Sequence, residues 1–226
     1  MPLKTVEEDD MLRTRILIYR ILSSAFLQFP HQQAIDTFAE ENLFINFPLH
    51  LETKDFEIGL AQLIAWSNQI NQTGKEAVLT QIKRDYSTLF VGPDHLLAPP
   101  WESVYLTDEK LTFGAPTLEV RKFFARHDLE YQLKNTEPDD HFGLELEFMA
   151  ELANRQLQAL EKELPAKAQY LKKEQLLFLK EHLLKWTDPF TQNVLEHAHT
   201  QYFQGMARIT RSYLSFDREY LECASA

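Results

Sequence analysis

The chain has 226 residues, 44% of them hydrophobic and 25% charged, proportions that are ordinary for a soluble globular protein. Its formal net charge of −11 disfavours nucleic acid as a partner, because such binding depends on lysine and arginine side chains that neutralise phosphates. The one cysteine, Cys223, excludes an internal disulfide and a metal cluster built from cysteines. No apolar run approaches the ~20 residues of a membrane span, and acidic residues stand at the N-terminus where a signal peptide needs bases. We therefore expect a cytoplasmic protein without stable membrane insertion.

The first half of the chain is expected to be helical, because its apolar residues recur at the helical period. A helix with Leu12 to Phe26 on one face ends before Pro30, and Arg15 lies off that face, which predicts a solvated side chain. Further helices are predicted around residues 35–38, over 53–72, and from Val78 to Phe90. Glycine is scarce and no run alternates polar with β-branched residues, which argues against a sheet.

The second half continues this pattern. A helix starting near Pro116 is predicted to bury four apolar side chains, namely Leu118, Val120, Phe123 and Phe124. Pro138 to Asp140 suit the start of a long helix, Pro165 starts another, and Asp188–Pro189 suit the start of the last one. The sequence thus predicts an all-α protein, a single compact domain over residues 1–226 of about eight to ten helices. Irregular loops are expected near 91–116 and 128–140.

The stretch from Tyr86 to Tyr105 has an unusual composition. It reads Y-S-T-L-F-V-G-P-D-H-L-L-A-P-P-W-E-S-V-Y, with Tyr86, Leu89 and Phe90 on one helical face. Gly92–Pro93 stops the helix, and an apolar, aromatic segment without periodicity follows. Such a loop is either buried or binds something. On composition alone, a packed crossover between two helical layers is the favoured interpretation.

Acidic residues concentrate in the segment 137–163, which contains eight acidic and two basic residues and so has a net charge of −6. A solvated helix face is the common explanation of such a run. Asp140 and His141 open this segment. Spacing alone favours a helix cap at Asp140, whereas a binding site would use the same carboxylate to hold a cationic group.

Catalytic motifs are absent from the sequence: it has no glycine-rich phosphate loop, no G-x-S-x-G and no H-E-x-x-H. We therefore predict a protein that is not an enzyme. His141 and Glu145 are four residues apart and could face a common ligand, so a helical metal-binding protein or enzyme using His141, Glu145 and Glu102 is one alternative. A structural adaptor whose central loop is core is another.

Four motifs together resemble the TorD/DmsD family of cytoplasmic maturation chaperones for exported molybdenum-cofactor enzymes. They are Y-S-T-L-F-V-G-P, L-A-P-P-W-E-S-V-Y-L, F-G-A-P-T-L-E-V-R and N-T-E-P-D-D-H-F-G-L-E-L. The DmsD branch is the most similar over the tryptophan and histidine motifs. Asp94 after Gly-Pro and Glu102 after the tryptophan depart from that branch, which bears on the client rather than on the fold.

The resemblance implies an all-helical chaperone that binds the twin-arginine signal peptide of a DMSO/TMAO reductase type of precursor and delays export until the cofactor is loaded. It places peptide binding on nine residues: Tyr86, Leu89, Phe90, Pro100, Trp101, Ser103, Tyr105, Asp140 and His141. Arginine suits carboxylate pairing, and aromatic faces suit apolar or cation–π contact. The protein is expected to be a monomer or homodimer. No cofactor is predicted, although the resemblance carries a weak implication of guanine nucleotide.

Overall fold

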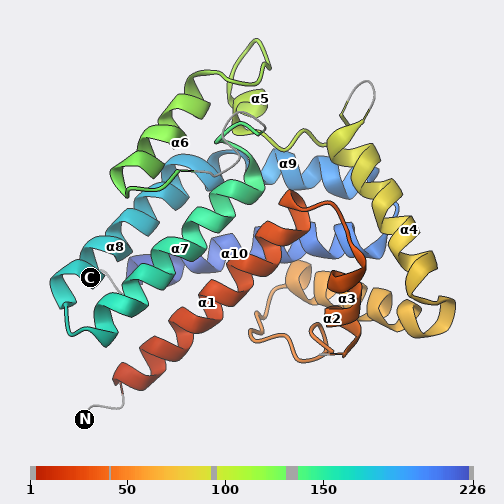
Figure 1. Cartoon of the computed structure of the whole chain (residues 1–226), viewed down its shortest axis with the longest axis horizontal. Coiled ribbons are helices and arrows are strands. Elements are labelled where there is room, and N and C mark those ends of the chain that lie inside the picture. Colours follow the sequence, from red (N-terminus) through yellow and green to blue (C-terminus); the bar gives the residue numbers. More distant parts are fainter. Residues whose placement is uncertain (1–3, 41, 93–95, 131–136, 224–226) are drawn as a thin grey trace. The chain divides into compact units, whose positions relative to one another are not determined.

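A computed structural model describes residues 4–40, 42–92, 96–130 and 137–223 (Figure 1). The described residues are mainly helical and contain no strand, which confirms the predicted all-α class. The helices are α1 Lys4–Leu27, α2 Gln32–Glu40, α3 Lys54–Thr73, α4 Lys75–Tyr86, α5 Glu102–Leu106, α6 Ala115–Arg126, α7 Phe142–Glu161, α8 Pro165–Phe178, α9 Leu184–His197 and α10 Gln201–Cys223. Two short π-helical segments, η1 Ser87–Val91 and η2 Leu179–Leu183, directly follow α4 and α8.

The chain divides into two compact units, each built from separate stretches of sequence. Unit 1 comprises Met1–Leu27, Trp101–Trp186 and Ser215–Ala226, and unit 2 comprises Gln28–Pro100 and Thr187–Leu214. The prediction of a single domain stays a prediction.

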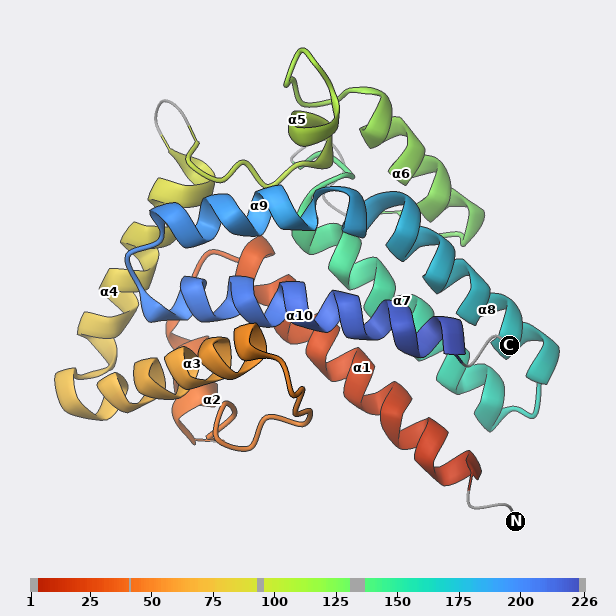
Figure 2. The ribbon, with the colours of Figure 1, turned by 180° about the vertical axis from the view of Figure 1, so that it is seen from behind.

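Unit 1 is built around α7, which packs along α1 on one side and against α8 on another (Figures 1 and 2). Leu12 and Ile16 of α1 meet Ala153 and Leu157 of α7 in a buried cluster. The two helices are in close contact at Gly143, where a Cβ atom would lie 2.5 Å from the Cβ of Leu27. Only glycine allows this approach, so the start of α7 is fixed against the end of α1.

Arg15 is fully buried in unit 1, so the predicted solvated side chain is wrong. Its Nε and Nη2 atoms lie 2.5 and 2.9 Å from the two carboxylate oxygens of Asp217, and the Tyr19 hydroxyl donates to Asp217 Oδ2 at 2.6 Å. The periodicity of α1 places Arg15 off the apolar stripe, but the partner carboxylate is 202 residues away in sequence. A buried arginine with such a partner satisfies the rule that buried charges are paired.

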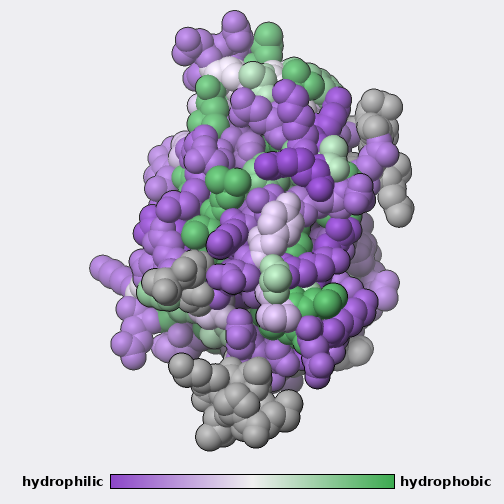
Figure 3. All heavy atoms as spheres, turned by 90° about the vertical axis from the view of Figure 1, so that its left-hand side faces the viewer, coloured by the Kyte–Doolittle hydropathy of each residue, from purple (hydrophilic) through white to green (hydrophobic). Residues whose placement is uncertain are grey.

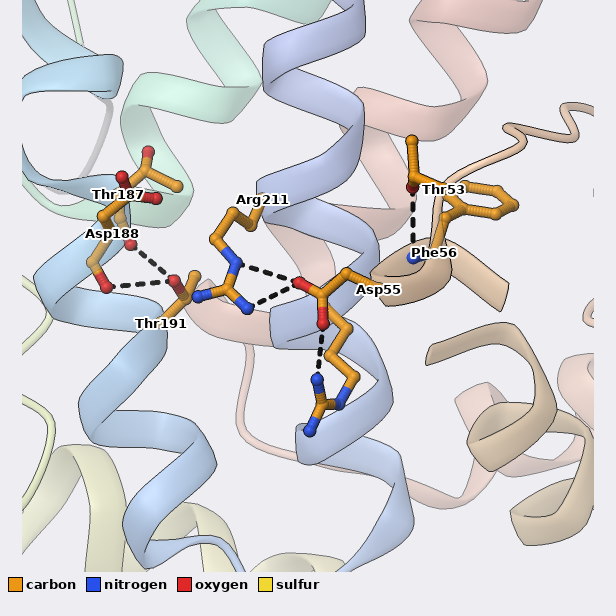
Figure 4. A network of polar contacts seen from close by, with 8 residues as sticks. Thr53, Asp55, Phe56, Thr187, Asp188, Thr191 and Arg211 are labelled. Atoms are coloured by element: carbon orange, nitrogen blue, oxygen red, sulfur yellow. Dashed lines mark hydrogen bonds and ion pairs between the residues drawn. The ribbon is translucent and has the colours of Figure 1, made fainter. Parts of the chain in front are cut away.

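Unit 2 places α3 across the first part of α10. Gly59 and Gly205 lie at the crossing, where a Cβ on Gly205 would come within 2.8 Å of the Gly59 carbonyl oxygen. Figure 4 shows Asp55 of α3 facing Arg211 of α10, whose Nε and Nη2 atoms are 2.9 and 2.5 Å from Asp55 Oδ2. Arg208 pairs with the other oxygen of Asp55. A close backbone contact and an ion-pair network therefore hold the two helices together.

The predicted start of the last helix at Asp188–Pro189 is wrong, because Pro189 lies inside α9. The helix is instead interrupted later, at residues 198–200, which separate α9 from α10. There the buried carboxylate of Asp85 accepts hydrogen bonds from the N–H groups of His199 and Thr200 and from the Thr200 hydroxyl. A carboxylate from α4 thus caps α10 from more than 110 positions away, a partner that no local sequence pattern reveals.

None of the helices among the described residues is both long enough and apolar enough to cross a membrane. The face drawn in Figure 3 is mostly hydrophilic, with hydrophobic residues in small scattered groups.

Candidate peptide-binding site

Four of the nine predicted peptide-binding residues belong to unit 2, and all four are buried. Tyr86 ends α4, and Leu89 and Phe90 lie in η1, with exposed fractions of 6%, 0% and 4%. The Phe90 ring lies 5.1 Å from that of Tyr86 and 5.5 Å from that of Phe203. These apolar side chains are part of the aromatic core of unit 2.

The loop after η1 folds back onto it. The N–H of Ala98 donates to the Leu89 carbonyl at 3.0 Å, and Gly92, with φ of 42°, closes the π turn by donating to Ser87 O at 2.7 Å. Pro100, the fourth residue, is buried at the end of this loop. Asp94, one of the departures from the DmsD pattern, lies outside the described residues.

Trp101, Ser103 and Tyr105 belong to unit 1, in and before α5. Trp101 is half-buried, forms an isolated β-bridge with His141, and donates from Nε1 to Glu137 Oε1 at 2.6 Å. Tyr105 is half-buried and its ring lies 5.4 Å from that of Trp186. The sequence predicts irregular structure here, whereas the segment after Trp101 forms the short helix α5.

Asp140 fixes the start of α5. Its carbonyl accepts from the N–H of Glu102 at 3.0 Å, and its Oδ2 accepts from the N–H of Ser103 at 2.8 Å. Asp140 and Ser103 are both fully buried, and Asp140 Oδ1 has no partner among the described residues. A carboxylate at a helix N-terminus satisfies free N–H groups and complements the helix dipole. Asp140 therefore caps α5, not the helix that follows it in sequence.

His141 is the residue that caps α7. Its Nδ1 accepts from the N–H of Gly143 at 3.0 Å, and the side chain is buried, with an exposed fraction of 3%. Burial lowers the pKa of His141 to about 3, so the ring is neutral at physiological pH. A neutral ring with Nδ1 as acceptor matches the hydrogen bond to Gly143.

Glu102 of α5 and Glu145 of α7 belong to a buried polar network. His182 Nδ1 is 3.0 Å from Glu102 Oε2, and Trp186 Nε1 donates to Glu145 Oε2 at 3.2 Å. Burial raises the pKa of Glu145 well above its usual value, and the neighbouring carboxyl groups of Glu102 and Asp140 raise it further. Glu145 is therefore favoured as the neutral acid.

The partners of these residues can be compared with the alternative of a metal-binding protein or enzyme that uses His141, Glu145 and Glu102. Glu102, Glu145 and His141 have separate partners, and the described residues contain no group of three His, Cys, Asp or Glu side chains that could hold a metal ion. Sequence reasoning missed His182, which is 80 residues from Glu102 and has no motif around it.

The neutral form of Glu145 predicts a dependence of stability on pH. A raised carboxyl pKa contributes stability that is fully present below the unfolded value near 4.5 and is lost as pH rises through the folded value. Glu145→Gln mimics the neutral acid at every pH. We expect the variant to gain stability relative to the unmodified protein as pH increases from 5 to 9, measured by urea unfolding. Parallel curves for the two proteins across this range would contradict a buried neutral acid.

Asp139 has a different partner from Asp140. Its Oδ2 lies 2.7 Å from Nε and 2.6 Å from Nη2 of Arg121, whose side chain is 42% exposed. The pair borders a cavity of about 380 Å³, lined by Arg121, Phe124, Ala125, Asp128, Leu129, Glu130 and Asp139. Sequence reasoning placed Asp139 only at a helix start. Arg121 ends the F-G-A-P-T-L-E-V-R motif, but no spacing in the sequence links it to Asp139.

Comparison with known proteins identifies relatives over most of the chain. The family model described as nitrate reductase delta subunit matches residues 53–192. The chaperone protein TorD of Shewanella pealeana is 28% identical over 227 residues, which cover 97% of this chain and 95% of that protein. These matches extend through both units.

Proteins of the DmsD type match over a shorter region. A protein of Haemophilus influenzae described as a probable Tat proofreading chaperone DmsD is 34% identical over 129 residues, 57% of this chain and 56% of that protein. The Tat proofreading chaperone DmsD of Salmonella paratyphi A is 31% identical over 130 residues, 58% of this chain and 57% of that protein. The chain thus matches little more than half the length of these DmsD proteins.

Proposed function

The chain belongs to the family of nitrate reductase delta subunits and TorD/DmsD chaperones, and we propose that it is a cytoplasmic maturation chaperone for an exported molybdenum-cofactor reductase. It binds the twin-arginine signal peptide of the precursor and delays export until the cofactor is loaded. The relatives are named as chaperones and not as enzymes, and the protein is not an enzyme.

One observation carries the proposal beyond family membership. In unit 1, the half-buried rings of Trp101 and Tyr105 share a segment with the cap made by Asp140, and Asp139 next to it already holds a guanidinium group. An arginine beside an apolar stretch, which is the pattern of a twin-arginine signal, finds a carboxylate and aromatic faces there. The net charge of −11 favours a basic partner.

The proposal assigns the nine predicted residues two kinds of role. Trp101 and Tyr105 contact the peptide, because both residues are partly exposed. Asp140, His141 and Ser103 hold the segment that carries these rings, and Tyr86, Leu89, Phe90 and Pro100 form the packed base of the preceding loop. The protein works as a monomer or homodimer and needs no cofactor.

The proposal is tested with a dimethyl sulfoxide reductase precursor and the same reductase lacking its signal peptide, each immobilised on beads. We expect the chaperone to be retained by the precursor and not by the truncated protein. Retention by both proteins to the same extent would show that recognition lies in the folded body of the client. Retention by neither, or only by the truncated protein, would remove the basis of the proposal.

A further inference from the structure

Four large apolar side chains around the start of α6 are exposed: Leu106, Leu111, Phe113 and Leu118, with exposed fractions of 40%, 65%, 60% and 51%. The sequence predicts that Leu118 is buried, and the structure shows that this is wrong. Leu111 and Phe113 have the highest exposed fractions among the large hydrophobic residues of the described part of the chain. We call these four residues the apolar patch. Several large apolar side chains exposed within one short segment are typical of an interaction site.

The loop between α5 and α6, which carries Leu111 and Phe113, is held by an internal hydrogen bond and by close packing of Gly114 on α5. The N–H of Lys110 donates to Thr107 O at 3.3 Å, and a Cβ on Gly114 would lie 3.5 Å from the side chains of Ser103 and Thr107. Phe113 has φ of 63°, a conformation that bulky residues adopt rarely. The loop thus keeps an aromatic ring in solvent at a cost in backbone strain, as loops at binding sites do.

One stripe of α6 connects the patch to the cavity beside Asp139. Leu118, Arg121 and Ala125 follow the spacing i, i+3 and i+7, which places them on one helical face. Arg121 and Ala125 line the cavity, and Asp128, Glu130 and Asp139 supply its carboxylates. We call this cavity the acidic pocket. From Leu118 to Ala125, which lines the pocket, the rise along α6 is about 10 Å at 1.5 Å per residue.

The acidic pocket already matches a guanidinium group. Both Nε and Nη2 of Arg121 lie within 2.7 Å of Asp139 Oδ2, and the arginine is partly exposed. Asp139 is only 8% exposed, so a guanidinium group from outside takes this carboxylate by displacing Arg121, and the exchange keeps the buried charge paired. The neighbouring carboxylate of Asp128 would compensate the second positive charge.

We propose that the docking surface for the signal peptide continues from Trp101 and Tyr105 onto this stripe of α6, with the peptide's arginines in the acidic pocket and its apolar run on the apolar patch. The inference rests on the proposed function and names the surface to which the signal peptide binds. The occupant follows from complementarity, because a peptide with basic residues directly before an apolar run matches an acidic cavity beside an apolar patch. A length of about 10 Å corresponds to about three extended residues, so both contacts lie within reach of one peptide. Tyr86, Leu89 and Phe90 are buried, whereas the patch is open to the apolar run.

The apolar half of the surface is tested with the double variant Phe113→Asn and Leu118→Gln. Asparagine tolerates the left-handed conformation at position 113, and both side chains are exposed, so the fold should be retained. We expect the Kd for a synthetic twin-arginine signal peptide to increase at least about tenfold, because two apolar contacts are lost. Leu177→Gln is the matched control, an exposed leucine on α8, and should leave the Kd within about twofold.

The charged half is tested at Arg121 and Asp128. Arg121→Gln removes the internal competitor for Asp139, and we expect the peptide to bind about threefold more tightly. Asp128→Asn is expected to weaken binding about threefold, and Glu163→Gln, another acidic residue with positive φ, serves as its control. A purely structural Arg121 would give equal or weaker binding in the Arg121→Gln variant.

The two levels of the proposal fail in different ways. If the unmodified protein does not bind the peptide, the proposed function fails. If it binds, but the double variant and Asp128→Asn bind equally well with unchanged melting temperatures, the α6 surface is wrong and the function stands. If the double variant loses binding but the Arg121→Gln variant binds the peptide with unchanged Kd, a peptide arginine does not replace Arg121 at Asp139.

Discussion

Asp217→Ala is expected to lower the free energy of unfolding by about 3–5 kcal/mol, the typical cost of removing one partner from a buried ion pair. Arg15 and Asp217 both have side-chain exposed fractions of 0%, and the substitution leaves the guanidinium group without its carboxylate in the interior of unit 1. It also removes the acceptor of the Tyr19 hydroxyl. Urea unfolding followed by circular dichroism measures the change.

The exposed pair of Lys180 and Glu222, 2.8 Å apart, provides the control. Glu222→Ala removes the same kind of contact at the surface, where solvent screens the charges, so the unfolding midpoint should hardly move. Equal midpoints for the Asp217→Ala variant and the unmodified protein would contradict the buried pair.

Asp140→Ala is expected to weaken binding of a twin-arginine signal peptide about tenfold, because it removes the acceptor that holds Ser103 N–H at the start of α5. Trp101 precedes this helix and Tyr105 lies in it, so both aromatic contacts lose their fixed position. The variant should also unfold at a lower urea concentration. Calorimetric titration and urea unfolding of the same preparations measure the two effects.

Asp140→Asn separates the hydrogen bond from the charge. The amide oxygen of asparagine can accept from Ser103 N–H, whereas the negative charge is gone. Because Asp140 is fully buried, we expect the asparagine variant to bind within about threefold of the unmodified protein. Equal losses in the alanine and asparagine variants would show that the charge of Asp140 itself holds the basic end of the peptide.

The helical fold could be predicted because it depends on local periodicity. Val120, Phe123 and Phe124 recur at helical spacing and are buried in α6, as the sequence predicts. Leu118 fits the same pattern and is exposed, because burial depends on whether a partner element covers that face. Periodicity shows which residues share a face but does not reveal what packs against it.

Long-range polar partners could not be predicted. The sequence pattern predicts that Arg15 is a surface residue, whereas its contact with Asp217 allows it to be buried. The start of α10 depends in the same way on a distant residue, Asp85. Proline preference placed the start of the last helix at Pro189, but such preferences are statistical and tertiary contacts override them.

The candidate site was predicted in part. The motifs located Trp101, Ser103, Asp140 and His141, and the structure brings these residues together through hydrogen bonds and a β-bridge. Only the folded structure shows that Trp101 is half-buried whereas Ser103, Asp140 and His141 are buried. The partnership of Arg121 and Asp139 spans the second loop, so spacing alone could not assign it.

The most direct test of the central claim is a calorimetric titration of the protein with a twin-arginine signal peptide from a dimethyl sulfoxide reductase and with its twin-lysine counterpart. The account predicts tight binding of the arginine peptide, weaker binding of the lysine peptide, and an affinity that falls with added salt, because arginine pairs with carboxylates through two donors and lysine through a point charge. No binding of the arginine peptide, or equal affinity for both peptides, would contradict recognition of the twin-arginine signal.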